Sequence, residues 1–129
     1  MDTSLSVKYI PPNDLRTIWS GIREGLEVIR SKGHTEWLPE DIYCDCFEQR
    51  AMLWLVGQGF MVLQPNGKEL HIWAAYSSNH QDVLDGLEAA KELAKKGGCN
   101  KLTFSSVRKG WEKSARILGF TPKVWELKI

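Results

Sequence analysis

This sequence has no long apolar run, no basic leader-like start and no excess of charge of either sign. No stretch approaches the roughly 18 apolar residues that a membrane-spanning helix needs, and residues 1–7 lack a basic region followed by an apolar run. The 17 basic and 16 acidic residues give a net charge of +1. We therefore expect a cytoplasmic protein without a membrane partner, and nucleic acid is not expected to bind.

Cysteine is also scarce. The three cysteines are an odd number, which does not suit a disulfide framework. Cys44 and Cys46 lie in a segment with helical spacing. Positions i and i+2 of a helix point about 200° apart around its axis, so the two thiols lie on nearly opposite sides. They cannot easily share one metal ion, so we expect reduced, half-buried thiols and no metal site.

What is present suits one globular domain over residues 1–129. The chain has a mass of 14.7 kDa, with 43% hydrophobic and 26% charged residues. That length can bury a core without disulfides or a metal.

Hydrophobic periodicity, together with glycine and proline positions, divides the chain into ten elements. They are an extended segment within residues 1–12, a helix from a cap at 13–14 to a stop at 33, a short helix from 39, strands over 51–56, 60–64 and 69–77, a helix over 82–96, a strand over 101–107, a helix ending at 119 and a strand over 124–129. The expected order is β-α-α-β-β-β-α-β-α-β.

The clearest part of the pattern spans residues 68–106. Asn66-Gly67 lies between two extended runs, which is a strong hairpin signal and favours a type I′ turn. A strand, an amphipathic helix and a second strand follow, and this order predicts a crossover between parallel strands. Ser78 with Gln81 and Asn79 with Asp82 are alternative caps for the helix. Ligands of open α/β sheets bind at the carboxyl ends of such strands, so the loop after the first strand is the first candidate site.

This order resembles the GNAT (GCN5-related N-acetyltransferase) fold over essentially the whole chain. The segment Leu118-Gly119-Phe120 matches the common end of that family's fourth helix. The resemblance implies an α/β (α+β) fold, with a mixed, mostly antiparallel sheet of about six strands and helices on both faces. Among members of the family, the chain is similar to the small, degenerate GNAT-like proteins of tailed bacteriophages, some of which are associated with the virion. That similarity would place it in the host cytoplasm or in a virion.

In GNAT enzymes the loop after the fourth strand carries an Arg/Gln-x-x-Gly-x-Gly/Ala motif that holds the coenzyme A pyrophosphate. The resemblance maps that cofactor site onto Ala75, Tyr76, Ser77, Ser78, Asn79, His80, Gln81 and Asp82. Glycines allow backbone N–H groups to approach the phosphates closely at the start of a helix. This loop has no glycine and no formal positive charge, and Asp82 adds a negative one. We do not expect tight coenzyme binding.

The family's usual general acid is a tyrosine four residues before the glycine of the Leu-Gly-Phe segment. Ala115 stands at that place and cannot donate a proton. Glu69 and His71 lie two residues apart on one face of the fourth strand, and either can be a general base toward an amine if it faces the cleft. The alternative for both is an ordinary, partly exposed strand face.

Three further features have two interpretations each. His80 either meets a phosphate or is an exposed loop histidine. Trp37, in a connector, is either an exposed anchor for a protein partner or part of the core. Basic residues near the last helix form either a solvated face or a contact with acidic groups or phosphates. They are Arg108, Lys109, Lys113, Arg116 and Lys123.

The sequence supports three hypotheses. The first is a GNAT-like domain that is degenerate for acetyl-CoA chemistry, has no cofactor and acts as a binding or assembly protein through a protein partner or self-association. The second is an active acyl-CoA-dependent N-acyltransferase that uses acetyl-CoA, with an atypical phosphate loop and a substrate that enters near the first two helices. The third is a nucleic-acid-associated protein that uses the basic last helix.

Overall fold

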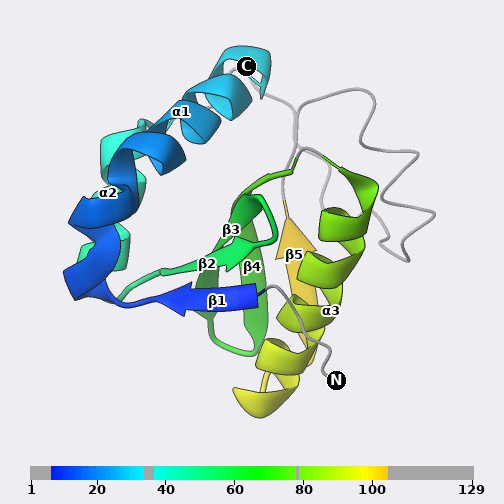
Figure 1. Ribbon diagram of the computed structural model, residues 1–129. Coiled ribbons are helices and arrows are strands. Elements are labelled where there is room, and N and C mark those ends of the chain that lie inside the picture. Colours follow the sequence, from blue (N-terminus) through cyan, green and yellow to red (C-terminus); the bar gives the residue numbers. More distant parts are fainter. Residues whose placement is uncertain (1–6, 34–36, 78, 105–129) are drawn as a thin grey trace, which may run out of the picture.

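The structure is a computed structural model that describes residues 7–33, 37–77 and 79–104 (Figure 1). Its elements are β1 (Val7–Ile10), the 3-10 turn η1 (Pro12–Asp14), α1 (Leu15–Gly33), α2 (Pro39–Phe47), β2 (Met52–Val56), β3 (Gly59–Asn66), β4 (Glu69–Tyr76), α3 (His80–Lys96) and β5 (Lys101–Phe104). The expected order is confirmed through β5, and η1 is an addition. The last expected helix and strand lie outside the described residues, as do Ala115, the Leu-Gly-Phe segment and the basic cluster.

The five described strands form one sheet in the order β1-β2-β3-β4-β5. Neighbouring strands are antiparallel except β4 and β5, which run parallel. Helix α3 connects this parallel pair, as the sequence predicted for the crossover unit (Figure 1). The mixed, mostly antiparallel sheet is therefore confirmed.

The hairpin between β3 and β4 has a different turn from the one predicted. Asn66 pairs with Glu69, so the two turn residues are Gly67 and Lys68 rather than Asn66 and Gly67. Gly67 has a φ of +64°, and Lys68 is not among the positive-φ residues. A positive φ at only the first turn residue is the pattern of a type II′ turn, which favours glycine there. The type I′ prediction was wrong because Asn66 continues the strand.

A bulge in β4 changes which side chains face the α1 side of the sheet and which face the α3 side. Val62 pairs with Ala74 and Leu63 pairs with Ile72, so Trp73 is an extra residue in the ladder. An extra residue shifts the two-residue alternation of a strand by one position. Leu70 and Ile72 consequently contact α3, whereas Ala74 and Tyr76 contact the core beneath α1.

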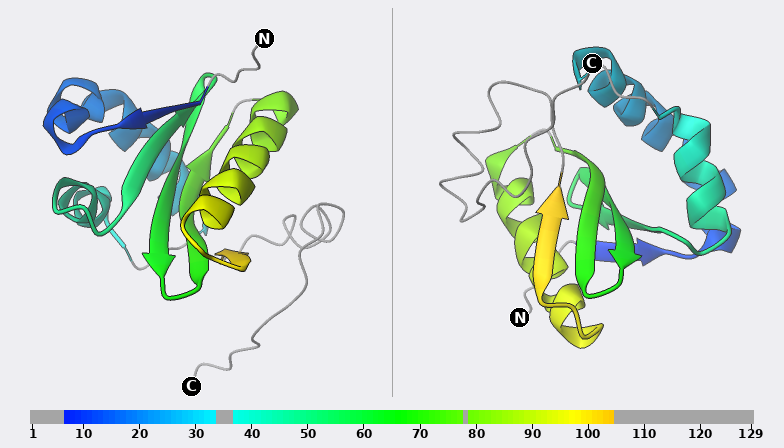
Figure 2. Two further views of the ribbon diagram at one scale, coloured as in Figure 1. Left: turned by 90° about the horizontal axis from the view of Figure 1, so that it is seen from below. Right: turned by 180° about the vertical axis from the view of Figure 1, so that it is seen from behind.

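Two apolar cores lie on the two faces of the sheet, which confirms helices on both sides (Figure 2). The first joins α1 and α2 to the sheet, and its buried members include Leu15, Leu26, Ile42, Leu53, Phe60 and Val62. The second joins α3 to the sheet, and its buried members are Val56, Met61, Leu63, Leu70, Ala90 and Ala94. Trp37 packs against the first core and is half-buried, so it is less exposed than the interpretation as an anchor requires.

Helix α1 lies close against the sheet at Gly25. A Cβ atom built there would lie 2.6 Å from the Phe60 ring and 3.3 Å from the Tyr76 ring. The two rings stack on each other with centroids 5.8 Å apart. The glycine therefore brings α1 against the carboxyl end of β4, where the candidate loop begins.

Candidate functional site

The carboxyl end of β4 has the geometry expected of a ligand site in an open sheet. Among the described residues, β5 pairs with the first half of β4, from Glu69 to Ile72. The second half of β4 leads into the loop and then into α3, which begins at His80. Crevices beyond the carboxyl ends of parallel strands are the usual binding places in such sheets.

Asn79 is the N-cap of α3, so of the two caps that the sequence offered, the Asn79–Asp82 pair is the one used. Asn79 has extended backbone, with φ −147° and ψ 159°. Its side-chain oxygen accepts the backbone N–H of Asp82 at 2.8 Å. A side-chain cap of this kind contributes about 1 kcal/mol to helix stability.

The carboxylate of Asp82 lies at the start of α3 and joins the loop to the turn between β2 and β3. Its Oδ2 accepts the backbone N–H of Gln58 and the side-chain amide of Asn79, each at 3.1 Å. Gly57 makes room for it: a Cβ atom there would overlap this carboxylate, and Gly57 has a φ of +58°. An anion near a helix N-terminus is stabilised by about 0.3–1 kcal/mol. The protein thus places its own negative group at the start of α3.

The other loop residues mostly contact one another. The Ser77 hydroxyl donates to the Asn79 carbonyl at 2.7 Å and accepts the Asn79 N–H at 3.3 Å. The Gln81 side-chain amide donates to Asp85 at 2.8 Å. Ala75 and His80 are exposed, Tyr76 is half-buried beside Phe60, and Ser78 lies outside the described residues.

Glu69 and His71 lie at the opposite end of β4 from this loop. Both are half-buried, and they alternate with the residues that face α3, so they share the α1 side of the sheet. His71 Nδ1 lies 2.8 Å from the Thr103 hydroxyl on β5. Tyr76 is five positions after His71, with the bulge at Trp73 between them, so the two lie roughly 15 Å apart along the strand. The structure therefore does not bring these two candidate bases together with the loop.

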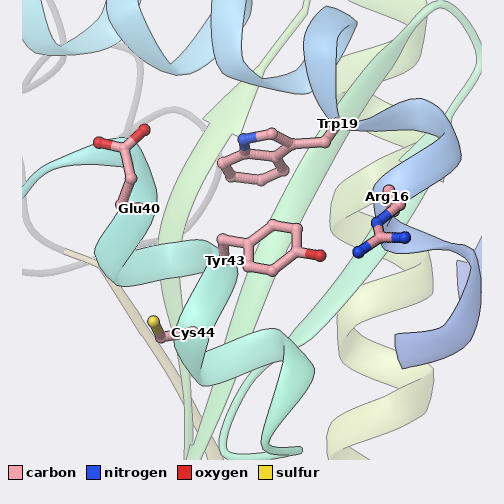
Figure 3. A pocket seen from close by; sticks show the side chains of 5 residues that line it. All are labelled: Arg16, Trp19, Glu40, Tyr43 and Cys44. Atoms are coloured by element: carbon pink, nitrogen blue, oxygen red, sulfur yellow. The ribbon is translucent and has the colours of Figure 1, made fainter.

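A pocket lies between α1 and α2, the two helices near which the enzyme hypothesis placed substrate entry (Figure 3). It has a volume of about 350 Å³ and is lined by Arg16, Trp19, Glu40, Tyr43 and Cys44. We call it the α1–α2 pocket. The Trp19 and Tyr43 rings meet edge to face, with centroids 4.9 Å apart. Tyr43 also stacks on Phe47, with centroids 6.2 Å apart and planes 7° from parallel.

Of the charged side chains at this pocket, Glu40 has an ion-pair partner among the described residues and Arg16 does not. Arg23 Nε donates to Glu40 at 2.9 Å. That hydrogen bond lowers the pKa of Glu40 and raises the pKa of Arg23. Arg16 lies on the other side of the aromatic pair and forms no ion pair with a described residue (Figure 3). Helical spacing identifies Trp19 and Tyr43 as parts of apolar stripes, but only the pairing of the two helices shows that they border a pocket.

The described cysteines differ in burial, which predicts different reactivity. Burial raises the pKa of Cys46 to about 12, whereas Cys44 is exposed. The thiolate is the form that reacts with alkylating agents, and a buried thiol with a raised pKa forms little of it. Iodoacetamide should therefore alkylate Cys44 and spare Cys46 in the native protein.

Fragmentation mass spectrometry of the tryptic peptide that contains both residues measures this difference. Urea-denatured protein is the control, in which both thiols should react. Equal labelling of the two thiols in native protein would contradict the burial of Cys46.

No helix of residues 7–33, 37–77 and 79–104 is long and apolar enough to cross a membrane. The same residues contain no group of three or more histidine, cysteine, aspartate or glutamate side chains that could hold a metal ion.

Comparison with known proteins finds similar structures but no similar sequence. No protein-family model and no curated protein sequence matches the chain. A probable acetyltransferase has a similar structure, with 14% identity and a TM-score of 0.67 over 97% of this chain and 98% of that one. An aminoglycoside acetyltransferase from an uncultured soil metagenomic sample, in complex with sisomicin, has 12% identity and a TM-score of 0.67 over 97% and 93%.

A third similar structure is the PaiA N-acetyltransferase from Thermoplasma acidophilum in complex with coenzyme A. It has 15% identity and a TM-score of 0.62 over 96% of this chain and 94% of that one. At such low identity these likenesses establish the fold alone. The fold of this chain is GNAT-like, as the element order predicted.

Proposed function

We propose that this GNAT-like domain is a binding module that does not use acetyl-CoA. The observation that carries the proposal is the Asp82 carboxylate at the start of α3, hydrogen-bonded to Gln58 and Asn79. A pyrophosphate would have to lie beside this fixed negative charge. It would gain only the partial positive charge of the helix end, which is about half a unit.

The geometry of the loop supports the same proposal. Binding a pyrophosphate at a helix N-terminus requires backbone N–H groups that turn toward it, and glycines provide the close approach. Residues 76–82 contain no glycine, and the side chains of Ser77, Asn79 and Asp82 contact neighbouring loop groups. The nearby Gly57 accommodates the Asp82 carboxylate rather than a ligand.

Calorimetric titration with acetyl-CoA tests the proposal. We expect no detectable heat of binding at millimolar ligand, since neither the glycines nor a cation for the pyrophosphate is present in the loop. Titrations at low and high salt serve as the control, because weak attraction to the helix end alone is screened by salt. A micromolar dissociation constant that persists at high salt would sink the proposal.

The binding partner that we propose is another protein or a second copy of this chain. The predicted resemblance to GNAT-like proteins of tailed bacteriophages, and with it a place in a virion, stays a prediction. Neighbouring capsid, portal or tail genes would support an assembly role, whereas neighbouring metabolic genes would favour an enzyme.

The second candidate is an acyl-CoA-dependent N-acyltransferase with an atypical phosphate loop. It is favoured by a similar structure that holds coenzyme A. Glu69 or His71 would then be the base, although both lie at the far end of β4 from the loop. The calorimetric experiment separates this candidate from the first.

A further inference from the structure

We propose that the α1–α2 pocket is the docking site for a protein partner, which inserts an apolar side chain next to a carboxylate. The apolar side chain would lie against Trp19 and Tyr43, and the carboxylate would pair with Arg16. This inference rests on the proposed function as a binding module and adds where the partner binds and which chemistry it presents.

The floor of the pocket provides a rigid apolar contact. Trp19 and Tyr43 come from different helices, and their edge-to-face contact fixes both rings at the α1–α2 boundary (Figure 3). Phe47 stacks on Tyr43 and is 53% exposed, so it extends the aromatic surface beyond the pocket. Tryptophan, tyrosine and arginine are the residues most enriched among those that dominate protein–protein binding energy.

The charge at the pocket indicates a carboxylate on the partner. The described residues include four arginines, and three of them, Arg23, Arg30 and Arg50, pair with carboxylates of this chain. Arg16, the fourth, lines the pocket without such a pair. Glu40 already accepts from Arg23, so these three charges sum to +1 at the pocket. An arginine can bind a carboxylate through two parallel hydrogen bonds, which adds direction as well as energy.

The shape of the pocket favours a protein over a small metabolite. Small-molecule sites usually enclose 70–90% of their ligand. Here Arg16, Glu40 and Cys44 are exposed, and the two rings are only half-buried. A volume of about 350 Å³ accommodates one large side chain that projects from a partner surface.

Selection of random peptides displayed on phage particles, with the full-length chain as immobilised target, tests the inference. We expect the enriched peptides to combine an aromatic or aliphatic residue with a neighbouring Asp or Glu. A second selection on Arg16→Glu should return peptides with Lys or Arg in place of the acidic residue. Arg16 is exposed, so this variant should keep its fold, which circular dichroism and thermal unfolding check.

Affinities of one synthetic acidic peptide, measured by fluorescence anisotropy, make the test quantitative. Arg16→Glu and Phe47→Ala should each weaken binding by about tenfold or more. Arg30→Glu is the matched control. Arg30 lies on nearly the same side of α1 as Arg16, but about 21 Å from it along the helix axis. It also pairs with Glu27. That variant should bind as the native chain does.

The outcomes separate this inference from the proposed function. Enriched peptides that bind Arg16→Glu equally well would overturn the pocket as the docking site and leave a binding module with its site elsewhere. Failure of the selection to enrich any peptide sequence would also overturn the inference. Tight acetyl-CoA binding together with the expected peptide motif would instead refute the proposed function and leave the docking site standing.

Discussion

Replacing Gly59 by alanine is expected to lower the free energy of unfolding by about 3 kcal/mol, toward the upper end of the usual cost of overpacking. Gly59 begins β3, and a Cβ atom there would overlap the backbone carbonyl oxygen of Tyr76. The carbonyl carbon of Tyr76 and the Cα of Ser77 would each lie 3.1 Å from it. Because these are backbone atoms, no side-chain rotation relieves the overlap, and the end of β4 must move.

Urea unfolding followed by circular dichroism measures this loss. Gly86→Ala is the matched control. Gly86 lies in α3, and its new methyl group would meet the Val56 side chain at 3.5 Å, an ordinary van der Waals distance. Alanine is up to about 1 kcal/mol better than glycine within a helix, so this variant should be as stable as the native chain or more so. A Gly59→Ala variant as stable as the native protein would show that the β3–β4 contact is not as close as described.

Truncating Leu26 to alanine is expected to cost about 2–5 kcal/mol, the range for a fully buried leucine. Leu26 has no exposed surface and lies in the core between α1 and the sheet. Its removal leaves a cavity next to Gly25, where α1 lies close to Phe60 and Tyr76. This loss should loosen the contact between α1 and the carboxyl end of β4.

Val28→Ala is the control on the same helix. Val28 is 37% exposed, and alanine is the better helix former, so the free energy of unfolding should change by less than about 0.5 kcal/mol. The same urea titration compares the two variants. Equal losses for Leu26→Ala and Val28→Ala would contradict the description of α1 as a helix with one buried face.

Much of the fold was predictable because its signals are local. The stripe from Val83 to Ala94 identifies α3, and Asn79 with Asp82 marks its first turn. The apolar run that ends at Val56 indicated a strand with both faces covered, and β2 does contribute to both cores. Together with the element order, these patterns predicted the GNAT-like fold, and the similar structures confirm that prediction.

Less of the candidate site was predictable, because its contacts join residues that are distant in sequence. The hydrogen bond between Asp82 and Gln58 spans 24 residues and depends on how α3 packs beside the β2–β3 turn. The insertion of Trp73 leaves no periodic mark in the sequence, yet it turns Ala74 and Tyr76 toward α1. The sequence suggested Trp37 as the exposed aromatic contact, whereas Phe47 is the more exposed residue.

The sequence by itself determined the order of the elements through β5, the two possible caps of α3 and the lack of glycine in the loop before it. These follow from side-chain periodicity and backbone preference, which act over a few residues. The tertiary structure alone decided that Asp82 fills the start of α3, that Glu69 and His71 lie away from it, and that Trp19 and Tyr43 meet beside Arg16. Such placements depend on the packing of whole helices and strands against one another, and no local pattern encodes that packing.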